Sequence, residues 1–157
     1  MKKIDVWLEK YAESHQNPTN KLIHWFCVPI ITFTLLGLLS LIDFNINTNN
    51  NIYNINFATI LVIAAIIFYI RLSVTLTIGM FFFSGICIYF ISKLSLTYSH
   101  QELFLYYFMG FLIAWIGQFI GHKIEGKKPS FFDDIKFLLI GPAWLLSFIY
   151  KKLHINI

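Results

Sequence analysis

Two short polar clusters interrupt an otherwise apolar chain, and both carry side chains that bind metals. The first cluster lies near the N-terminus in the segment SHQNPTNKLIH and holds His15, Asn17, Asn20 and His24. The second follows a long apolar run in the segment QFIGHKIEGKKP and holds Gln118, His122, Glu125 and Pro129. Ionisable groups at the ends of membrane helices are costly to desolvate, so they indicate a functional site.

Three imidazoles and one carboxylate would surround a single point if the two clusters met in space: those of His15, His24, His122 and Glu125. Such groups suit iron, zinc, copper or manganese. Two histidines with a carboxylate and open positions are the pattern of non-haem Fe(II) oxygenases, whereas three histidines with an open position also fit catalytic zinc. The residues therefore predict a metal centre and leave the identity of the metal open.

Three amide side chains accompany the candidate ligands: those of Asn17, Asn20 and Gln118. We expect them to hydrogen-bond to the imidazoles and so to fix their tautomers and orientation. Gln118 lies one helical turn before His122 and shares its face, as does Glu125. Which of Glu125, Gln118 or His100 completes the ligand set stays open, although His100 is expected on the opposite side of the membrane.

The alternative without a metal is that the histidines are ordinary polar residues at helix ends. Gln118 and Glu125 would then satisfy backbone groups, or pair with Lys123 or Lys128. The presence of three histidines on one predicted side of the membrane favours the metal. His154 lies in the C-terminal tail and is left out.

The composition places these clusters in an integral membrane protein with one domain, residues 1–157. Hydrophobic residues make up 57% of the chain and charged residues only 13%, whereas soluble domains carry about 25%. A net charge of +4 would also suit nucleic acid, but the cations lie at the ends of apolar runs and are better explained as membrane anchors. Cys27 and Cys87 lie inside apolar runs and are expected to be inert thiols.

The apolar runs predict an all-α helical bundle with four spanning helices, at residues 18–42, 53–70, 72–92 and 103–121. A fifth run, 135–150, is short and contains Gly141-Pro142, so it either spans or re-enters the membrane. Residues 45–56 hold seven asparagines and are expected to form a solvated loop.

Residues 1–16 predict an amphipathic helix with an apolar face formed by Ile4, Trp7, Leu8 and Tyr11. This helix would lie on the membrane surface or cap the bundle. Asn17 and Pro18 then match the cap and the first position of the next helix.

The distribution of lysine and arginine predicts that both polar clusters face the cytoplasm. Four of these residues precede residue 22 and four lie in 123–136, while 43–52 contain none. Four crossings between the two segments would place them on the same side. The membrane would be the inner membrane of a bacterium or the endoplasmic reticulum of a eukaryote. A stripe of small residues predicts where the fourth helix packs on a neighbour: Gly110, Ala114, Gly117 and Gly121.

At these motifs the chain resembles the membrane-bound 2-hydroxy fatty acid dioxygenases, which comprise a fungal endoplasmic-reticulum enzyme of fatty acid α-oxidation and its bacterial relatives. The resemblance covers nearly the whole chain and includes WIGQFIGHKIEGKKPSFFDD and the closing LLIGPAW. The chain departs from the family at Gly126-Lys127, where an arginine-rich stretch is common, and at Ser130-Phe131, where Ala-Leu is frequent. Neither departure touches a candidate ligand.

The resemblance implies an Fe(II)-dependent enzyme that uses O2 to remove one carbon from a 2-hydroxy fatty acid. Such a substrate chelates a metal through its carboxylate and hydroxyl, and no nucleotide or haem is required. Two other classes stay open on the residues alone: a zinc-dependent hydrolase of membrane lipids, and a membrane protein without catalytic activity. The oligomeric state is not indicated.

Overall fold

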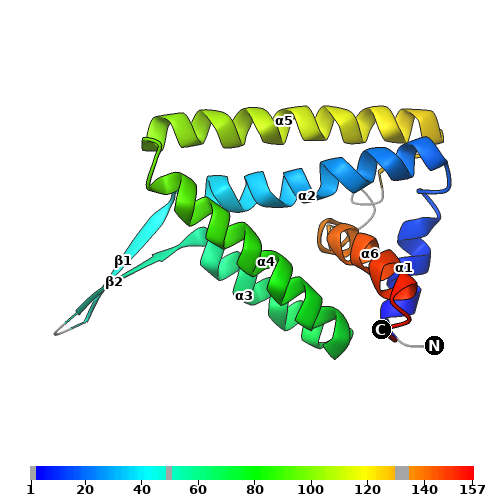
Figure 1. Ribbon diagram of the computed structural model, residues 1–157, viewed down its shortest axis with the longest axis horizontal. Coiled ribbons are helices and arrows are strands. Elements are labelled where there is room, and N and C mark those ends of the chain that lie inside the picture. Colours follow the sequence, from blue (N-terminus) through cyan, green and yellow to red (C-terminus); the bar gives the residue numbers. More distant parts are fainter. Residues whose placement is uncertain (1–2, 49–50, 130–134) are drawn as a thin grey trace.

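Six helices and one two-stranded hairpin form the part of the chain that the computed structural model describes, residues 3–48, 51–129 and 135–157 (Figure 1). In chain order they are α1 (Lys3–Ala12), α2 (Pro18–Ser40), β1 (Asp43–Thr48), β2 (Asn51–Asn56), α3 (Phe57–Ile70), α4 (Val74–Ser95), α5 (His100–Glu125) and α6 (Phe137–Lys152). The fold is helical, as the composition predicts.

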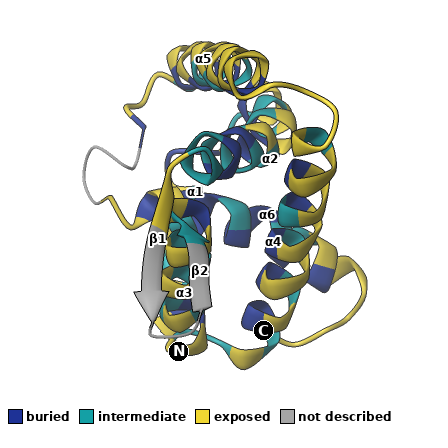
Figure 2. Cartoon of the chain, turned by 90° about the vertical axis from the view of Figure 1, so that its left-hand side faces the viewer, coloured by how far each residue is buried: buried dark blue, intermediate teal, exposed yellow. Residues whose placement is uncertain are grey.

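Helices α2 and α5 lie side by side in antiparallel orientation and form the frame of the molecule (Figures 1 and 2). Glycines of α5 allow the close approach, since a Cβ atom on Gly117 would lie 2.7 Å from Cys27 Sγ of α2. The corresponding space at Gly121 is filled by the side chain of Asn20, and Gly110 makes a looser contact with α2. The predicted packing stripe is therefore confirmed at its glycines. It brings the start of α2 beside the end of α5, where both polar clusters lie.

Three of the described helices are long and apolar enough to cross a membrane: α2, α4 and α5. Helix α3 has 14 residues, which span about 21 Å, whereas the hydrocarbon core of a bilayer is about 30 Å thick. The expected number of four spanning helices is therefore not confirmed. Helix α6 has 16 residues and continues without a break through Gly141 and Pro142.

The expectation of a loop at 45–56 is wrong, because β1 and β2 pair there as an antiparallel hairpin. Phe44 pairs with Ile55, and Ile46 pairs with Tyr53. On β1, Phe44 and Ile46 alternate with polar residues, and this period of two is a strand signal that the asparagine content obscures. Residues 49 and 50 lie outside the described residues. The hairpin projects from the end of α2 that is remote from His24 (Figure 1).

Helices α1 and α6 close the other end of the α2–α5 pair. The predicted apolar face of α1 packs on α6, with Trp7 and Phe137 in an edge-to-face contact at 5.4 Å between ring centroids. Tyr11 contacts Trp144 of α6 at 5.3 Å, and Ile4 is completely buried. The amphipathic helix therefore caps the bundle, and it ends at Ala12 in a turn that leads to α2.

Candidate metal centre

Three histidines from different parts of the chain meet beneath this cap. His15 comes from the turn between α1 and α2, His24 from α2 and His122 from the last turns of α5. One potential ligand atom from each imidazole lies within 4.8 Å of the other two. All three side chains are buried. The two polar clusters therefore meet, as the residues predict.

The three rings stand edge-on to one another, as they would around a common point. The ring centroids of His15 and His24 lie 4.3 Å apart at an interplanar angle of 81°. His122 lies 4.9 Å from His15 and 5.0 Å from His24, at 75° and 88°. Such an arrangement directs ring nitrogens inward and leaves no stacked pair among the three.

Backbone carbonyls fix the tautomers of two imidazoles. His15 Nδ1 lies 2.6 Å from the carbonyl oxygen of Tyr11, and His24 Nδ1 lies 2.9 Å from that of Asn20. A carbonyl can only accept, so each Nδ1 carries the hydrogen and, in a neutral ring, each Nε2 presents a lone pair. The two Nε2 atoms are 2.9 Å apart. Lone pairs this close require a cation or a proton between them.

A metal ion fits this separation. Nitrogens that each lie about 2.1 Å from one ion can be up to about 4.2 Å apart, so the two Nε2 atoms can share an ion without moving. His122 needs only a small adjustment to join them. Its buried Nδ1 has no hydrogen-bond partner among the described residues, and a buried nitrogen without a partner costs about 1–3 kcal/mol. A ligand in this space would remove that cost.

Burial is the main reason why His15 stays neutral. Desolvation, together with the nearby imidazole of His24, lowers the pKa of His15 from 6.5 to about 3, although its hydrogen bond to the Tyr11 carbonyl works in the opposite direction. A proton is therefore a poor bridge between the two Nε2 atoms at neutral pH. The neutral imidazole is the form that binds metals.

Glu125 binds the turn between α1 and α2 instead of joining the three imidazoles. One carboxylate oxygen accepts from the backbone N–H of Gln16 at 2.8 Å, and the other accepts from that of Asn17 at 2.9 Å and from Asn20 Nδ2 at 3.0 Å. Gly126, with φ of 74°, ends α5 directly after Glu125. The carboxylate thereby ties the end of α5 to the segment that carries His15.

The three amides expected to orient imidazoles have different contacts. Asn17 caps α2, accepting from the backbone N–H of Thr19 at 2.9 Å, which confirms the predicted cap. Asn20 does hold an imidazole, but through its backbone carbonyl, while its side chain binds Glu125. Gln118 is buried one turn before His122 and lines a pocket beside it.

The structure adds Tyr11 to the residues of the site and removes His100 from the candidate ligands. Tyr11 was expected only as part of an apolar helix face, yet its carbonyl orients His15 and its ring stacks on that imidazole at 4.1 Å. The signal available in the sequence was its spacing of four residues from His15. His100 lies at the far end of α5, about 33 Å from His122 along the helix, so it cannot complete the ligand set.

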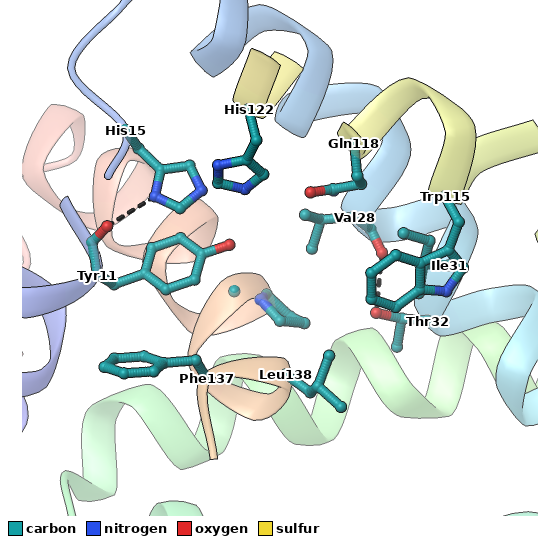
Figure 3. A pocket seen from close by; sticks show the side chains of 12 residues that line it. Tyr11, His15, Val28, Ile31, Thr32, Trp115, Gln118, His122, Phe137 and Leu138 are labelled. Carbon is teal, nitrogen blue, oxygen red and sulfur yellow. Dashed lines mark hydrogen bonds between the residues drawn. The ribbon is translucent and has the colours of Figure 1, made fainter. Parts of the chain in front are cut away.

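A pocket opens beside the histidines between α2, α5, α6 and α1 (Figure 3). It offers about 420 Å³ of space, part of it open to solvent. The residues that line it are Tyr11, His15, Val28, Ile31, Thr32, Trp115, Gln118, His122, Phe137, Leu138, Gly141 and Pro142. Imidazoles and an amide lie toward one side and apolar side chains toward the other, so the pocket suits an amphipathic molecule whose polar end faces the histidines.

A family model described as "2-hydroxy-palmitic acid dioxygenase Mpo1-like" matches residues 1–153. No curated protein and no solved structure gives a significant match to the chain. The matched region includes all three histidines and every residue that lines the pocket. The chain therefore belongs to the Mpo1-like family of 2-hydroxy-palmitic acid dioxygenases.

Proposed function

We propose that the protein is an Fe(II)-dependent dioxygenase that shortens 2-hydroxy fatty acids by one carbon. The observation that carries the proposal is the pair of Nε2 atoms of His15 and His24, 2.9 Å apart, with both Nδ1 atoms committed to carbonyls. That pair calls for a cation, and His122 supplies a third nitrogen nearby. The family supplies the class of reaction.

His15, His24 and His122 would hold the metal, which when bound as Fe(II) supplies the electrons and open positions that O2 chemistry needs. Glu125 would position His15 through the turn at Gln16 and Asn17. Gln118 would face the polar end of the substrate in the pocket. The apolar side chains would receive the adjoining part of the acyl chain and keep water from the reacting atoms.

The proposed reaction balances without a further reductant. A 2-hydroxy acid and one O2 contain the atoms of the acid one carbon shorter, one CO2 and one water. The bond that breaks joins the carboxyl carbon to the carbon that bears the hydroxyl, and O2 is reduced as both carbons are oxidised. A site at the end of membrane helices suits a substrate whose carboxylate stays at the headgroups while its tail lies in lipid.

A zinc-dependent lipid hydrolase is the second candidate, because three histidines with an open position also activate water at zinc. Purification without oxygen, followed by metal analysis and incubation with 2-hydroxyhexadecanoic acid and O2, separates the two. Iron and oxygen-dependent release of pentadecanoic acid are expected. Zinc with no oxygen consumption would contradict the proposal.

We further propose that the metal centre faces the cytoplasm, because lysines concentrate before residue 22 and in 123–136. Single cysteines in place of the exposed Lys3 and Lys128 should then react with a membrane-impermeant thiol reagent only from the cytoplasmic side. A cysteine in place of the exposed Leu96, which follows the last residue of α4, should react from the other side. Labelling of Lys3→Cys and Lys128→Cys from different sides would contradict this orientation.

A further inference from the structure

Tyr11 is held rigidly against the metal centre. Its ring stacks on the imidazole of His15, with 4.1 Å between centroids and 10° between planes. Phe137 and Trp144 of α6 contact the same ring at 6.0 and 5.3 Å. These three rings fix where the phenol points.

The Tyr11 hydroxyl points into the pocket, toward the space beside His122 and Gln118 (Figure 3). No described residue forms a hydrogen bond with it, although buried tyrosine hydroxyls usually find a partner. Tyr69 and Tyr150 follow that rule, donating to the carbonyls of Leu139 at 2.6 Å and Thr75 at 3.0 Å. The free hydroxyl of Tyr11 therefore faces the pocket beside the histidines.

Helix α6 leaves room for this hydroxyl. A Cβ atom on Gly141 would lie only 3.1 Å from Tyr11 Oη and 3.7 Å from Val28 Cγ1. Any larger residue would press on the phenol and narrow the pocket. The glycine before Pro142 thus preserves both the orientation of Tyr11 and the open space in front of its oxygen.

The pocket contains no lysine or arginine among the described residues that line it. A carboxylate that enters would be met by the metal ion and by neutral donors alone. The Nδ1 hydrogens of His15 and His24 are already donated to carbonyls, and the Thr32 hydroxyl donates to the carbonyl of Val28. The Tyr11 hydroxyl and the Gln118 amide are among the donors that the lining still offers. A hydrogen bond to a charged acceptor is worth about 1.5–3 kcal/mol, more than one between neutral groups.

We propose that Tyr11 is a substrate-binding residue whose hydroxyl donates a hydrogen bond to the carboxylate of the 2-hydroxy fatty acid beside the metal. The inference rests on the proposed function, since it takes that acid as the ligand. Tyr11 would thereby fix which end of the substrate faces the histidines. It would also link substrate binding to His15, on which its ring is stacked.

The test compares Tyr11→Phe with Tyr107→Phe. Tyr107 is a matched control, because it is buried and its hydroxyl also has no described partner, but it does not line the pocket. Each purified protein is loaded with Fe(II) without oxygen. Iron content is measured first, and then the dissociation constants of 2-hydroxyhexadecanoic acid and of hexadecan-2-ol, in which a methyl group replaces the carboxyl group.

Tyr11→Phe should keep its iron, bind the acid about tenfold or more weakly, and bind hexadecan-2-ol as the unmodified protein does. Tyr107→Phe should match the unmodified protein for both ligands. Equal affinity of Tyr11→Phe for the acid, loss of its iron, or an equal loss for both ligands would overturn the role of Tyr11. If the unmodified protein itself fails to bind the acid, the proposed function fails and this inference fails with it.

Discussion

The two ends of the α2–α5 pair pack in the same way but bury different groups. At one end Gly121 makes space for Asn20, and at the other Gly37 makes space for the ring of Tyr107. Each end also carries a histidine of α5. His122 is buried among other imidazoles. His100 is exposed, and its Nε2 lies 3.0 Å from the carbonyl oxygen of Leu41.

The difference comes from what covers each end. Helices α1 and α6 cover the end at His122, where α1 contributes the ring of Tyr11 and the turn after it contributes His15. The hairpin lies at the other end and projects away from the helices (Figure 1). A histidine at a helix end thus becomes a candidate metal ligand only where further elements bring other imidazoles and bury its side chain.

The largest expected effect of this difference is on metal content. His15→Ala, His24→Ala and His122→Ala should each abolish iron binding and the shortening of 2-hydroxy fatty acids, because each removes one of the three gathered nitrogens. His100→Ala should leave both unchanged. Metal quantification on purified variants checks this. Loss of iron in His100→Ala would contradict a metal site at the His122 end of the helix pair.

A smaller effect is expected from the two glutamates of α5. Glu125→Gln should weaken iron binding about 10–100-fold without abolishing it, because Glu125 holds the turn next to His15 and is not itself a ligand. Glu102, which caps the other end through Ser99, is the control, and Glu102→Gln should not alter iron affinity. Complete loss of iron in Glu125→Gln at saturating metal would instead identify the carboxylate as a ligand.

A moderate loss of stability is expected when the packing of the helix pair is disturbed. Gly121→Ala should lower the free energy of unfolding by about 1–3 kcal/mol and weaken iron binding, because the added methyl group overlaps the side chain of Asn20. Gly85→Ala on α4 is the matched control, since a Cβ atom there meets nothing within 4 Å. Thermal unfolding in detergent measures the stability of both variants. Equal stability of the two variants would contradict the close contact at Gly121.

The last expected effect is the response of the metal-free protein to pH. His15 has a pKa of about 3 in the folded state and about 6.5 when unfolded, so acidification adds a proton to the unfolded chain first. The metal-free protein should therefore lose stability as the pH falls below about 6.5, until His15 also titrates in the folded state near 3. Melting temperatures in detergent between these values test this. His15→Ala should make the pH dependence less steep, whereas His100→Ala should not.

The residues predicted the packing stripe of α5 and the cap of α2 because both depend on local patterns. The glycine stripe of α5 and the cap at Asn17 are each visible within one or two helical turns. The hairpin was missed because strand pairing depends on residues that face one another across a turn. The partners of Glu125 were missed for a related reason, since they are backbone groups whose position depends on how α1 leads into α2.

Tyr11 shows a further limit of sequence patterns. Its spacing from Ile4, Trp7 and Leu8 predicts a buried helix face, and the ring is indeed buried. The same spacing cannot show that the carbonyl holds His15 or that the hydroxyl faces a pocket, because both depend on where α6 packs. The length of α3 likewise depends on the hairpin before it.

Three gathered imidazoles should hold one metal ion. X-ray absorption at the iron edge, measured on the unmodified protein reconstituted without oxygen, tests it most directly. We expect three imidazole nitrogens at about 2.1 Å from a single iron and no sulfur ligand, in keeping with the positions of His15, His24 and His122. Failure to retain iron, or a spectrum with fewer than three imidazoles, would contradict it.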